Sequence, residues 1–256
     1  MSSARGGVSR GPRRPLSRIA VVGLMLALLA ALGILLPGPV YRFNAWALGT
    51  ALAVLRWAVY AGLAAVVVSL VGAVLARPRG PRRGFPYAVL GLLIGLAVVG
   101  VPLAYVRTAQ SVPPIHDVTT DTEDPPQFEA LLPLRADAPN PAAYAGETVA
   151  AQQRAAYPDI APVTVPVPPD EAFGRALAVA REMGWEIVAA EEAEGRIEAT
   201  ETTFWFGFKD DVVIRIRPAE ARSRVDVRST SRIGVSDLGV NAARVRRFLE
   251  EFRERV

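Results

Sequence analysis

The first half of the chain is dominated by three long runs of apolar residues. Ile19–Leu36 contains eighteen residues without a charge, and as a helix it is about 27 Å long, enough to cross the hydrocarbon core of a bilayer. A second run covers Ala45–Ala76, with Arg56 as its one charge, and a third covers Tyr87–Val106. We expect three membrane-spanning helices, the first of which ends at Pro37-Gly38-Pro39.

From Val163 onward, apolar positions follow the spacings of strands and helices. Val163–Val167 alternates as a short edge strand, and a helix is expected from Pro169 to Met183, ended by Gly184. Four further strands are expected at Trp185–Ala190, Arg196–Phe206, Val212–Arg217 and Arg224–Ser229, the middle two joined by a turn at Lys209-Asp210-Asp211. A last helix, capped by Ser236-Asp237, is expected to run to about Arg255.

This order of elements predicts a two-layer α+β domain after three transmembrane α-helices. Hairpin links imply an antiparallel sheet of about five strands with two helices on one face. Residues 108–160 are rich in proline and acidic residues, a composition that disfavours regular helices and interior strands. The expected parts are a basic tail (1–18), a membrane anchor (19–107), an extended connector lying over the domain (108–160) and the soluble domain (161–256).

Charge divides the chain at the same place. Residues 1–110 hold twelve of the 29 basic residues and no Asp or Glu, so their formal charge is +12. The remaining seventeen basic and 25 acidic residues give −8, and an acidic domain repels nucleic acid. Nine of the twelve N-terminal arginines lie in the tail and in the loop between the second and third apolar runs. The positive-inside rule therefore places the tail and this loop in the cytoplasm, and everything after Val106 outside.

These features predict a multi-pass protein of the inner cell membrane, with the lipid bilayer as a partner and a periplasmic or otherwise extracytoplasmic C-terminal domain. In an alternative interpretation the first apolar run is a cleaved signal peptide, which leaves the final sidedness unchanged. The run is longer than the apolar core of most signal peptides, and no Ala-x-Ala site follows it directly. Because no Asp, Glu or His lies within the three runs, a transporter or channel is disfavoured.

Catalytic chemistry has few residues to draw on. The chain has no cysteine and one histidine, His116, which excludes disulfides, cysteine nucleophiles and multi-histidine metal sites. We expect neither a metal nor a cofactor. His116 and Asp117 are the weak candidates for general acid–base catalysis, although a His-Asp step in a proline-flanked connector more often pins a loop. The sequence favours a protein that is not an enzyme and leaves the question open.

Two groups of polar residues suit an anionic ligand. The first lies on the strand face opposite the core valines and contains Arg215, Arg224, Asp226 and Arg228, with Arg232 close behind. Arginine forks bind carboxylates and phosphates in a bidentate manner. The alternative is a solvated face of weak cross-strand ion pairs.

The second group consists of Ser236, Asp237 and Asn241 at the start of the last helix. Free backbone N–H groups at a helix start attract anions, and simple capping by Ser236 or Asp237 is the alternative. Nearby, a strand ends in the aromatic cluster Trp205, Phe206 and Phe208. We expect these rings to pack in the core or the hairpin, or, if exposed, to touch the bilayer or a partner.

Several C-terminal segments resemble one family. They are Pro113–Asp121, Gly195–Thr200, Phe206–Ile216, Ser223–Ser229 and Ser231–Ala242. Together they extend over about residues 111–250 and are similar to the uncharacterised family called domain of unknown function 1499. The resemblance implies an envelope or organelle-membrane setting and supplies neither an activity nor catalytic residues.

These observations predict a membrane-tethered domain that binds an anionic envelope ligand, such as a lipid head group or a glycan, or another envelope protein. An envelope enzyme that uses His116, Asp117 or the Arg/Asp face is one alternative. A membrane scaffold or assembly factor is the other.

Overall fold

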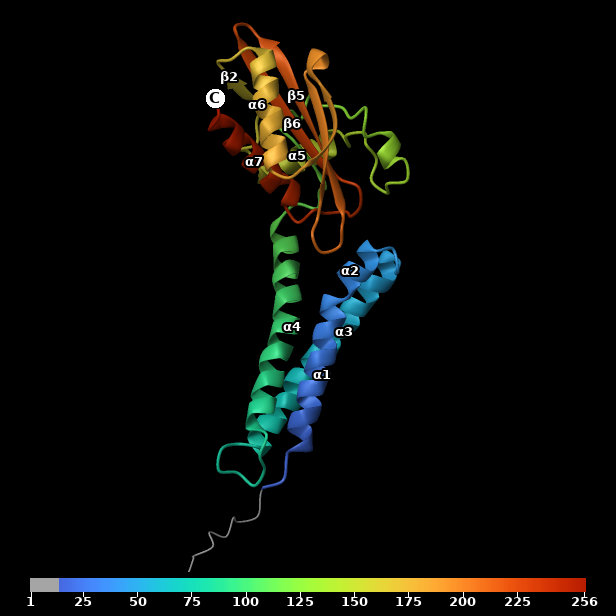
Figure 1. The fold of residues 1–256 in the computed structure, drawn as a ribbon, viewed down its shortest axis with the longest axis vertical. Helices are drawn as coiled ribbons and strands as arrows, with labels where there is room; N and C mark the ends of the chain where they lie inside the picture. The colour runs from blue at the N-terminus through green and yellow to red at the C-terminus, as the bar shows by residue number, and fades with distance from the viewer. Residues whose placement is uncertain (1–13) are drawn as a thin grey trace, which may run out of the picture. The chain divides into compact units, whose positions relative to one another are not determined.

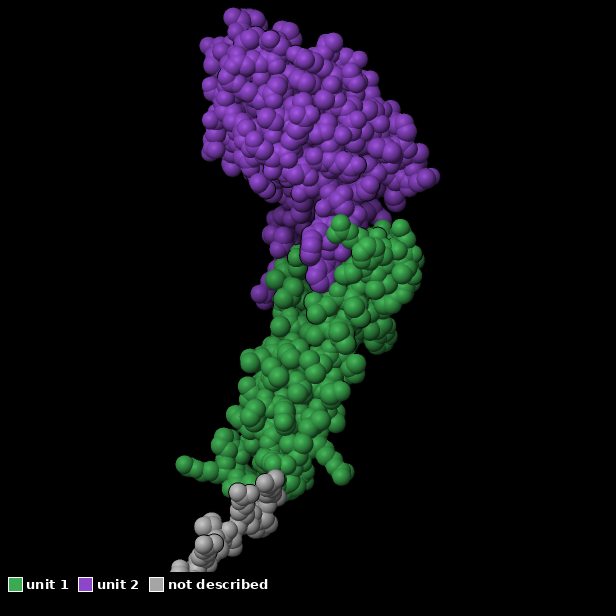
Figure 2. Space-filling view, in the orientation of Figure 1, with its two compact units in different colours: residues 1–105 green, residues 106–256 purple. Residues whose placement is uncertain are grey.

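The structure is a computed structural model that describes residues 14–256 and divides the chain into two compact units, Met1–Tyr105 and Val106–Val256 (Figure 2). Arg5, Arg10 and Arg13 of the predicted basic tail lie outside the described residues.

The first unit is built from apolar helices. They are α1 (Arg18–Leu35), α2 (Pro37–Arg42), α3 (Leu48–Leu75) and α4 (Phe85–Ser111), the last of which continues into the second unit. Three segments are long and apolar enough to cross a membrane, and α1 and α2 together form the first of them. The prediction of three such segments is confirmed. Pro37 begins α2 instead of ending helical structure, because proline is tolerated in the first turn of a helix.

The helices of this unit pack through small residues. A Cβ added at Gly91 of α4 would lie 2.6 Å from Ser69 Oγ of α3 and 3.0 Å from the backbone of Leu24 in α1. A side chain therefore does not fit at this position without displacing a neighbouring helix. Small residues allow such close backbone approach in membrane helices.

The second unit is built on one antiparallel sheet of six strands (Figure 1). The strands are β1 (Asp117–Thr119), β2 (Val163–Val165), β3 (Glu186–Glu191), β4 (Arg196–Thr202), β5 (Lys209–Ala219) and β6 (Arg222–Ser231). Their order is β1-β6-β5-β4-β3, and β2 also pairs with β6. The predicted α+β class is confirmed, with one strand more than expected.

One face of the sheet carries the main apolar core. The helices α6 (Pro169–Glu182) and α7 (Val240–Arg253) cover this face (Figure 1). Alternate side chains of the central strands, such as Ile214 and Val227, are buried beneath them with Phe248. Side chains on a strand alternate between faces, so the residues in between point to the opposite side.

The segment expected to be an extended connector contains regular structure. Besides β1 it forms the short 3-10 helix η1 (Pro133–Arg135) and the helix α5 (Glu147–Ala156). Gln153 of α5 binds the free side of β1, because the Thr119 N–H donates to Gln153 Oε1 (2.9 Å) and Gln153 Nε2 donates to the Thr119 carbonyl (2.6 Å). The Gln153 side chain thus makes the two backbone hydrogen bonds that a neighbouring strand would make with this edge of β1. For this reason β1 can form within a proline-rich segment.

Residues 120–145, here called the strap, cover the second face of the sheet. Phe128 and Leu131 of the strap pack on Val213 of β5, with Ala142 and Val188 beside them. The domain thus has helices on one face of the sheet and an irregular chain on the other. The strap therefore buries the middle of the second face.

The β4–β5 hairpin and the last helix differ in detail from expectation. Lys209, Asp210 and Asp211 were expected to form the turn, but they begin β5, and the turn consists of residues 203–208. The two aspartates are buried and bound by arginines, so their polarity does not place them in a solvated turn. Helix α7 begins at Val240, three residues after Asp237.

Candidate functional site

Beneath the strap, charged side chains of β4, β5 and β6 form a buried layer. Glu198, Asp211, Asp226 and Arg228 have no exposed surface. The alternative interpretation of a solvated face does not hold for these four residues, because the strap lies over them. We call these residues and their ion-pair partners the charge layer.

Arg228 lies at the centre of the charge layer. Its Nε and Nη2 donate to the two carboxylate oxygens of Asp117 at 3.0 and 2.7 Å. The same guanidinium donates to the backbone carbonyls of Pro126 (3.1 Å) and Ala142 (2.7 Å) in the strap. It also lies over the rings of Phe128 and Tyr144, 5.0 and 5.4 Å from their centroids. One side chain of the sheet therefore binds the strap at several points.

Asp226 joins three arginines of the same face. Its carboxylate accepts hydrogen bonds from Arg215, Arg217 and Arg224 at 3.1 to 3.2 Å. Arg217 and Arg224 lie directly opposite each other on β5 and β6, where like charges repel. Asp226 and the strap residue Asp121, which accepts from Arg224 at 2.5 Å, offset this repulsion.

Asp211 is the corresponding acceptor near the other end of β5. It binds Arg232 through two hydrogen bonds of 2.8 Å and Thr200 at 2.7 Å, and it is paired with Arg135 of the strap. Burial opposes ionisation of this carboxyl, but the hydrogen bonds and positive charges of its partners hold its pKa below the ordinary value. Arg232 also donates to the Leu134 carbonyl in the strap.

The predicted residues at the start of α7 have structural partners. Asp237 accepts from the backbone N–H groups of Gly239 (2.8 Å) and Asn241 (2.7 Å), and Ser236 Oγ accepts from Leu238 N–H (3.2 Å). Burial raises the pKa of Asp237, and these hydrogen bonds oppose the shift. The Asn241 side chain accepts from Ser229 Oγ (2.6 Å) and donates to the His116 carbonyl (3.0 Å). The residue that caps α7 is Gly239 and not Ser236 or Asp237. The Asp237 carboxylate instead binds backbone N–H groups from just before the helix, and Asn241 links the first turn of α7 to β6 and to His116.

His116 and Asp117 take part in different contacts. His116 Nδ1 lies 3.4 Å from the Val235 carbonyl, whereas the Asp117 carboxylate binds Arg228 within the charge layer. The other predicted residues do not meet in one site either. Arg228 binds Asp117, and Arg232 binds Asp211. Asp237 binds backbone N–H groups before and within the first turn of α7.

Two further sets of polar contacts were not predicted from the sequence. Arg244 is buried between α7 and the sheet, where it binds Asp210 at 2.7 Å and Glu201. The sequence contains one indication that Arg244 is buried, since it lies next to Val245 on the apolar face of the helix. Glu198 accepts from the consecutive backbone N–H groups of residues 129, 130 and 131 at 2.8 to 3.0 Å, a contact that no local pattern predicts.

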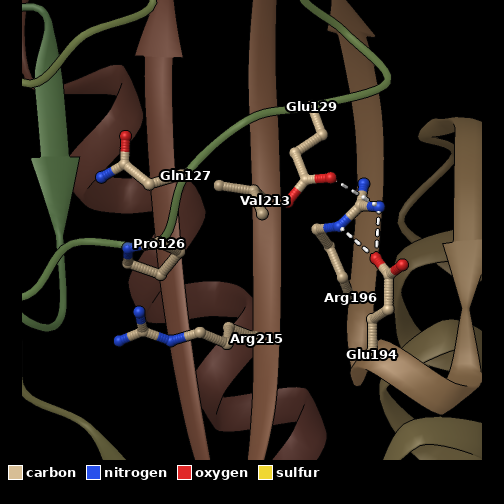
Figure 3. A pocket seen from close by; sticks show the side chains of 7 residues that line it. All are labelled: Pro126, Gln127, Glu129, Glu194, Arg196, Val213 and Arg215. Carbon is tan, nitrogen blue, oxygen red and sulfur yellow. Dashed lines mark hydrogen bonds and ion pairs between the residues drawn. The ribbon is translucent and has the colours of Figure 1, made fainter.

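A recess of about 300 Å³ lies between the strap and the face of the sheet formed by β4 and β5 (Figure 3). Its lining residues are Pro126, Gln127, Glu129, Glu194, Arg196, Val213 and Arg215. Arg196 and Arg215 are directly opposite partners in the β4–β5 pairing, so their side chains leave the sheet on the same face. Of the arginines predicted to bind a ligand, Arg215 is the one that lines this recess.

Each of these two arginines has both buried and exposed partners. Arg196 pairs with the fully buried Glu198 and with Glu194 and Glu129, whose side chains are 57% and 63% exposed. Arg215 likewise pairs with the buried Asp226 and with the exposed Asp124 on the strap. The inner carboxylates hold the guanidinium groups in place, and the outer ones are open to water. Within residues 14–256, no group of three or more His, Cys, Asp or Glu side chains is arranged to hold a metal ion.

The structure defines a class of protein in which apolar helices precede an α+β domain whose sheet is covered by an irregular strap. The family described as "Protein of unknown function (DUF1499)" matches residues 117–252, which begin at β1 and end in α7. The chain belongs to this family, and the resemblance seen in the sequence is confirmed. The matched range includes the strap and α5, so both are part of the family domain. A comparison with curated proteins gives no match.

Replacement of Arg228 by Met is expected to destabilise the domain by about 3–5 kcal/mol, because it leaves the buried Asp117 carboxylate without its partner. Denaturant unfolding of the full-length protein in detergent, followed by fluorescence of the buried Trp185, measures the loss. Replacing both residues, Asp117→Leu with Arg228→Met, should recover part of it. Arg246→Met, which breaks an exposed pair with Asp159, is the control and should change stability by less than about 1 kcal/mol.

Asp211 is expected to make stability fall in acid. Because its folded-state pKa is lowered, its contribution is present above the unfolded value of about 3.9 and is lost as pH falls through the lower folded value. Asp211→Asn should therefore flatten the dependence of the unfolding free energy on pH below about 4. The exposed Asp137→Asn is the control, and an equal slope in wild type and Asp211→Asn would contradict the assignment.

Proposed function

We propose that the protein is a multi-pass protein of the inner cell membrane whose C-terminal domain lies outside the cytoplasm and binds an anionic envelope ligand. The cross-strand arginine pair at the recess, Arg196 and Arg215, is the observation that carries the binding role. The membrane placement is supported by the three apolar segments and by the distribution of arginines.

Hydrogen bonds within the first unit support the proposed sidedness. The Ser17 N–H donates to the Arg83 carbonyl at 2.9 Å, and the Arg83 N–H donates to the Pro15 carbonyl at 3.0 Å. The end of the basic tail and the arginine-rich loop before α4 therefore lie at the same end of the helices. An arginine-rich end is retained in the cytoplasm. Because α4 is the one span that follows the arginine-rich loop, the chain after α4 would lie on the opposite side of the membrane.

A topology experiment tests this placement. Alkaline phosphatase is active only outside the cytoplasm, so a fusion after Val256 should be active and a fusion after Arg83 should be inactive. Both fusions are compared at equal expression. The reverse pattern would show that the domain is cytoplasmic and would overturn the proposal.

The recess suits an anion because the outer carboxylates are easily replaced. Exposed ion pairs such as those of Glu129 and Glu194 contribute only about 0–1 kcal/mol each. A ligand carboxylate or phosphate can take the place of Glu129 and Glu194 on Arg196, or of the exposed Asp124 on Arg215. Glu198 and Asp226 keep the two guanidinium groups in position. The two guanidinium groups point away from each other (Figure 3), so each one offers its own planar fork to the paired oxygens of a carboxylate or phosphate.

The groups around the recess support binding more than catalysis. An arginine guanidinium is a permanent cation in proteins and cannot pass a proton to a substrate. Glu129 and Glu194 are the counterions of Arg196, and Asp124 is a counterion of Arg215. Proton transfer needs a group whose pKa lies near the working pH. We therefore place recognition of the ligand, without a chemical step, at this site.

Variants of the recess separate a binding site from an ordinary ion-pair cluster. Glycerol phosphate and glucuronate are titrated into the full-length protein by calorimetry, as probes of phosphate and carboxylate recognition. Glu129→Gln with Glu194→Gln should tighten binding because it removes the competing carboxylates. Arg196→Gln should weaken binding about tenfold or more, the loss expected for a hydrogen bond between charged groups.

Arg246→Gln is the matched control, since Arg246 forms an exposed ion pair with Asp159 elsewhere on the domain. It should bind the probes as wild type does. Binding by wild type that is unaffected by Arg196→Gln would move the site away from the recess. Absence of binding for both probes would overturn the anionic-ligand proposal.

A further inference from the structure

We propose that one end of the domain rests in the head-group region of the bilayer through two apolar tips. The first tip is the β4–β5 turn, residues 203–208. The second is residues 232–240, which comprise the loop between β6 and α7 and the first residue of α7. The inference rests on the proposal that α4 crosses the membrane, and it does not depend on the ligand site or on which side the domain occupies.

Both tips expose large apolar side chains. Phe204 is 84% exposed and is followed by the exposed Trp205 in the first tip, while Val235 is 78% exposed in the second, where Val240 is also exposed. An apolar side chain left in water at a turn gains free energy when it is buried. The tips therefore favour an apolar surface over water.

The two tips lie at the same end of the sheet. The Arg232 N–H donates to the Lys209 carbonyl at 3.0 Å, and Asp210 pairs with Ser231, so the turn that precedes β5 lies beside the loop that follows β6. Figure 1 shows this turn in orange and this loop in red at one end of the sheet.

The chain enters the domain at this end. The Asp237 N–H donates to the Ile115 carbonyl at 3.1 Å, and His116 Nδ1 lies 3.4 Å from the Val235 carbonyl. Helix α4 ends at Ser111, and the four residue steps from there to Ile115 extend over at most about 14 Å. The second tip is therefore held within a short distance of the end of a predicted membrane span.

The chemistry of the tips fits the interface and not the interior of the bilayer. Tryptophan and other aromatic side chains prefer the level of the head groups. Lys209, the only lysine in the chain, is exposed at the base of the first tip, where its ammonium can reach anionic head groups. The stacked rings of Phe206 and Phe208, 5.0 Å apart, stiffen the turn that carries Phe204 and Trp205.

The absence of cysteine makes a direct test possible. Thr202→Cys, at the exposed end of β4, is labelled with the polarity-sensitive dye NBD in the full-length protein. The protein is reconstituted in vesicles of phosphatidylethanolamine and phosphatidylglycerol with or without nitroxide-labelled lipid. The dye should show blue-shifted emission and should be quenched by the nitroxide lipid. Phe204→Ser with Trp205→Ser in the same background should lose both effects.

Ala221→Cys is the matched control. Ala221 is exposed in the β5–β6 turn, at the opposite end of the same strands, so its dye should remain in water and unquenched. A dye at position 202 that behaves like the control, or that is blue-shifted without lipid quenching, would overturn the inference. Resistance of the protein to carbonate extraction is measured in parallel. Loss of this resistance would overturn the proposal that the helices cross the membrane. If the protein stays resistant but the dye behaves like the control, only the inference about the tips is overturned.

Discussion

The guanidinium of Arg228 has no contact with solvent, and this places a strict condition on the rest of the domain. A buried charge is tolerated only where a counterion and further hydrogen-bond acceptors surround it. Asp117 comes from β1, and the remaining acceptors are backbone carbonyls of the strap. The first strand, the strap and the last strand of the sheet must therefore all be in place before this side chain is satisfied.

The same condition explains why the face opposite the helices is charged although it is covered. Phe128 and Leu131 are the large apolar side chains that the strap buries, whereas its Leu132 and Leu134 are exposed. Hydrophobic burial alone therefore holds the strap weakly. Arginines and carboxylates of the sheet bind its backbone and its acidic side chains instead, as Glu198 does with three consecutive N–H groups. Such pairs add little net free energy compared with apolar packing, but each has a definite geometry. They hold an irregular segment in one position.

Local patterns in the sequence predicted the apolar helices, most of the strands and the alternation of valine and arginine on β5 and β6, because periodicity reports which face of an element is buried. They predicted two helices on one face and a connector lying over the domain, but not that this connector covers the arginine-bearing face. Arg228 and Arg215 have the same sequence context as solvated strand arginines, and their burial follows from a segment about a hundred residues earlier. Arg196 was likewise missed as a recess residue, since its pairing with Arg215 depends on the register of β4 and β5.

The pairing of Asp117 with Arg228 also has a consequence in time. The two residues are 111 positions apart, and a ribosome adds about 5–20 residues per second, so Arg228 follows Asp117 by roughly 6–22 s. During that interval β1 and the strap have neither the strand nor the charges on which they fold. β1 and the strap therefore cannot reach their final contacts until β6 has been synthesised.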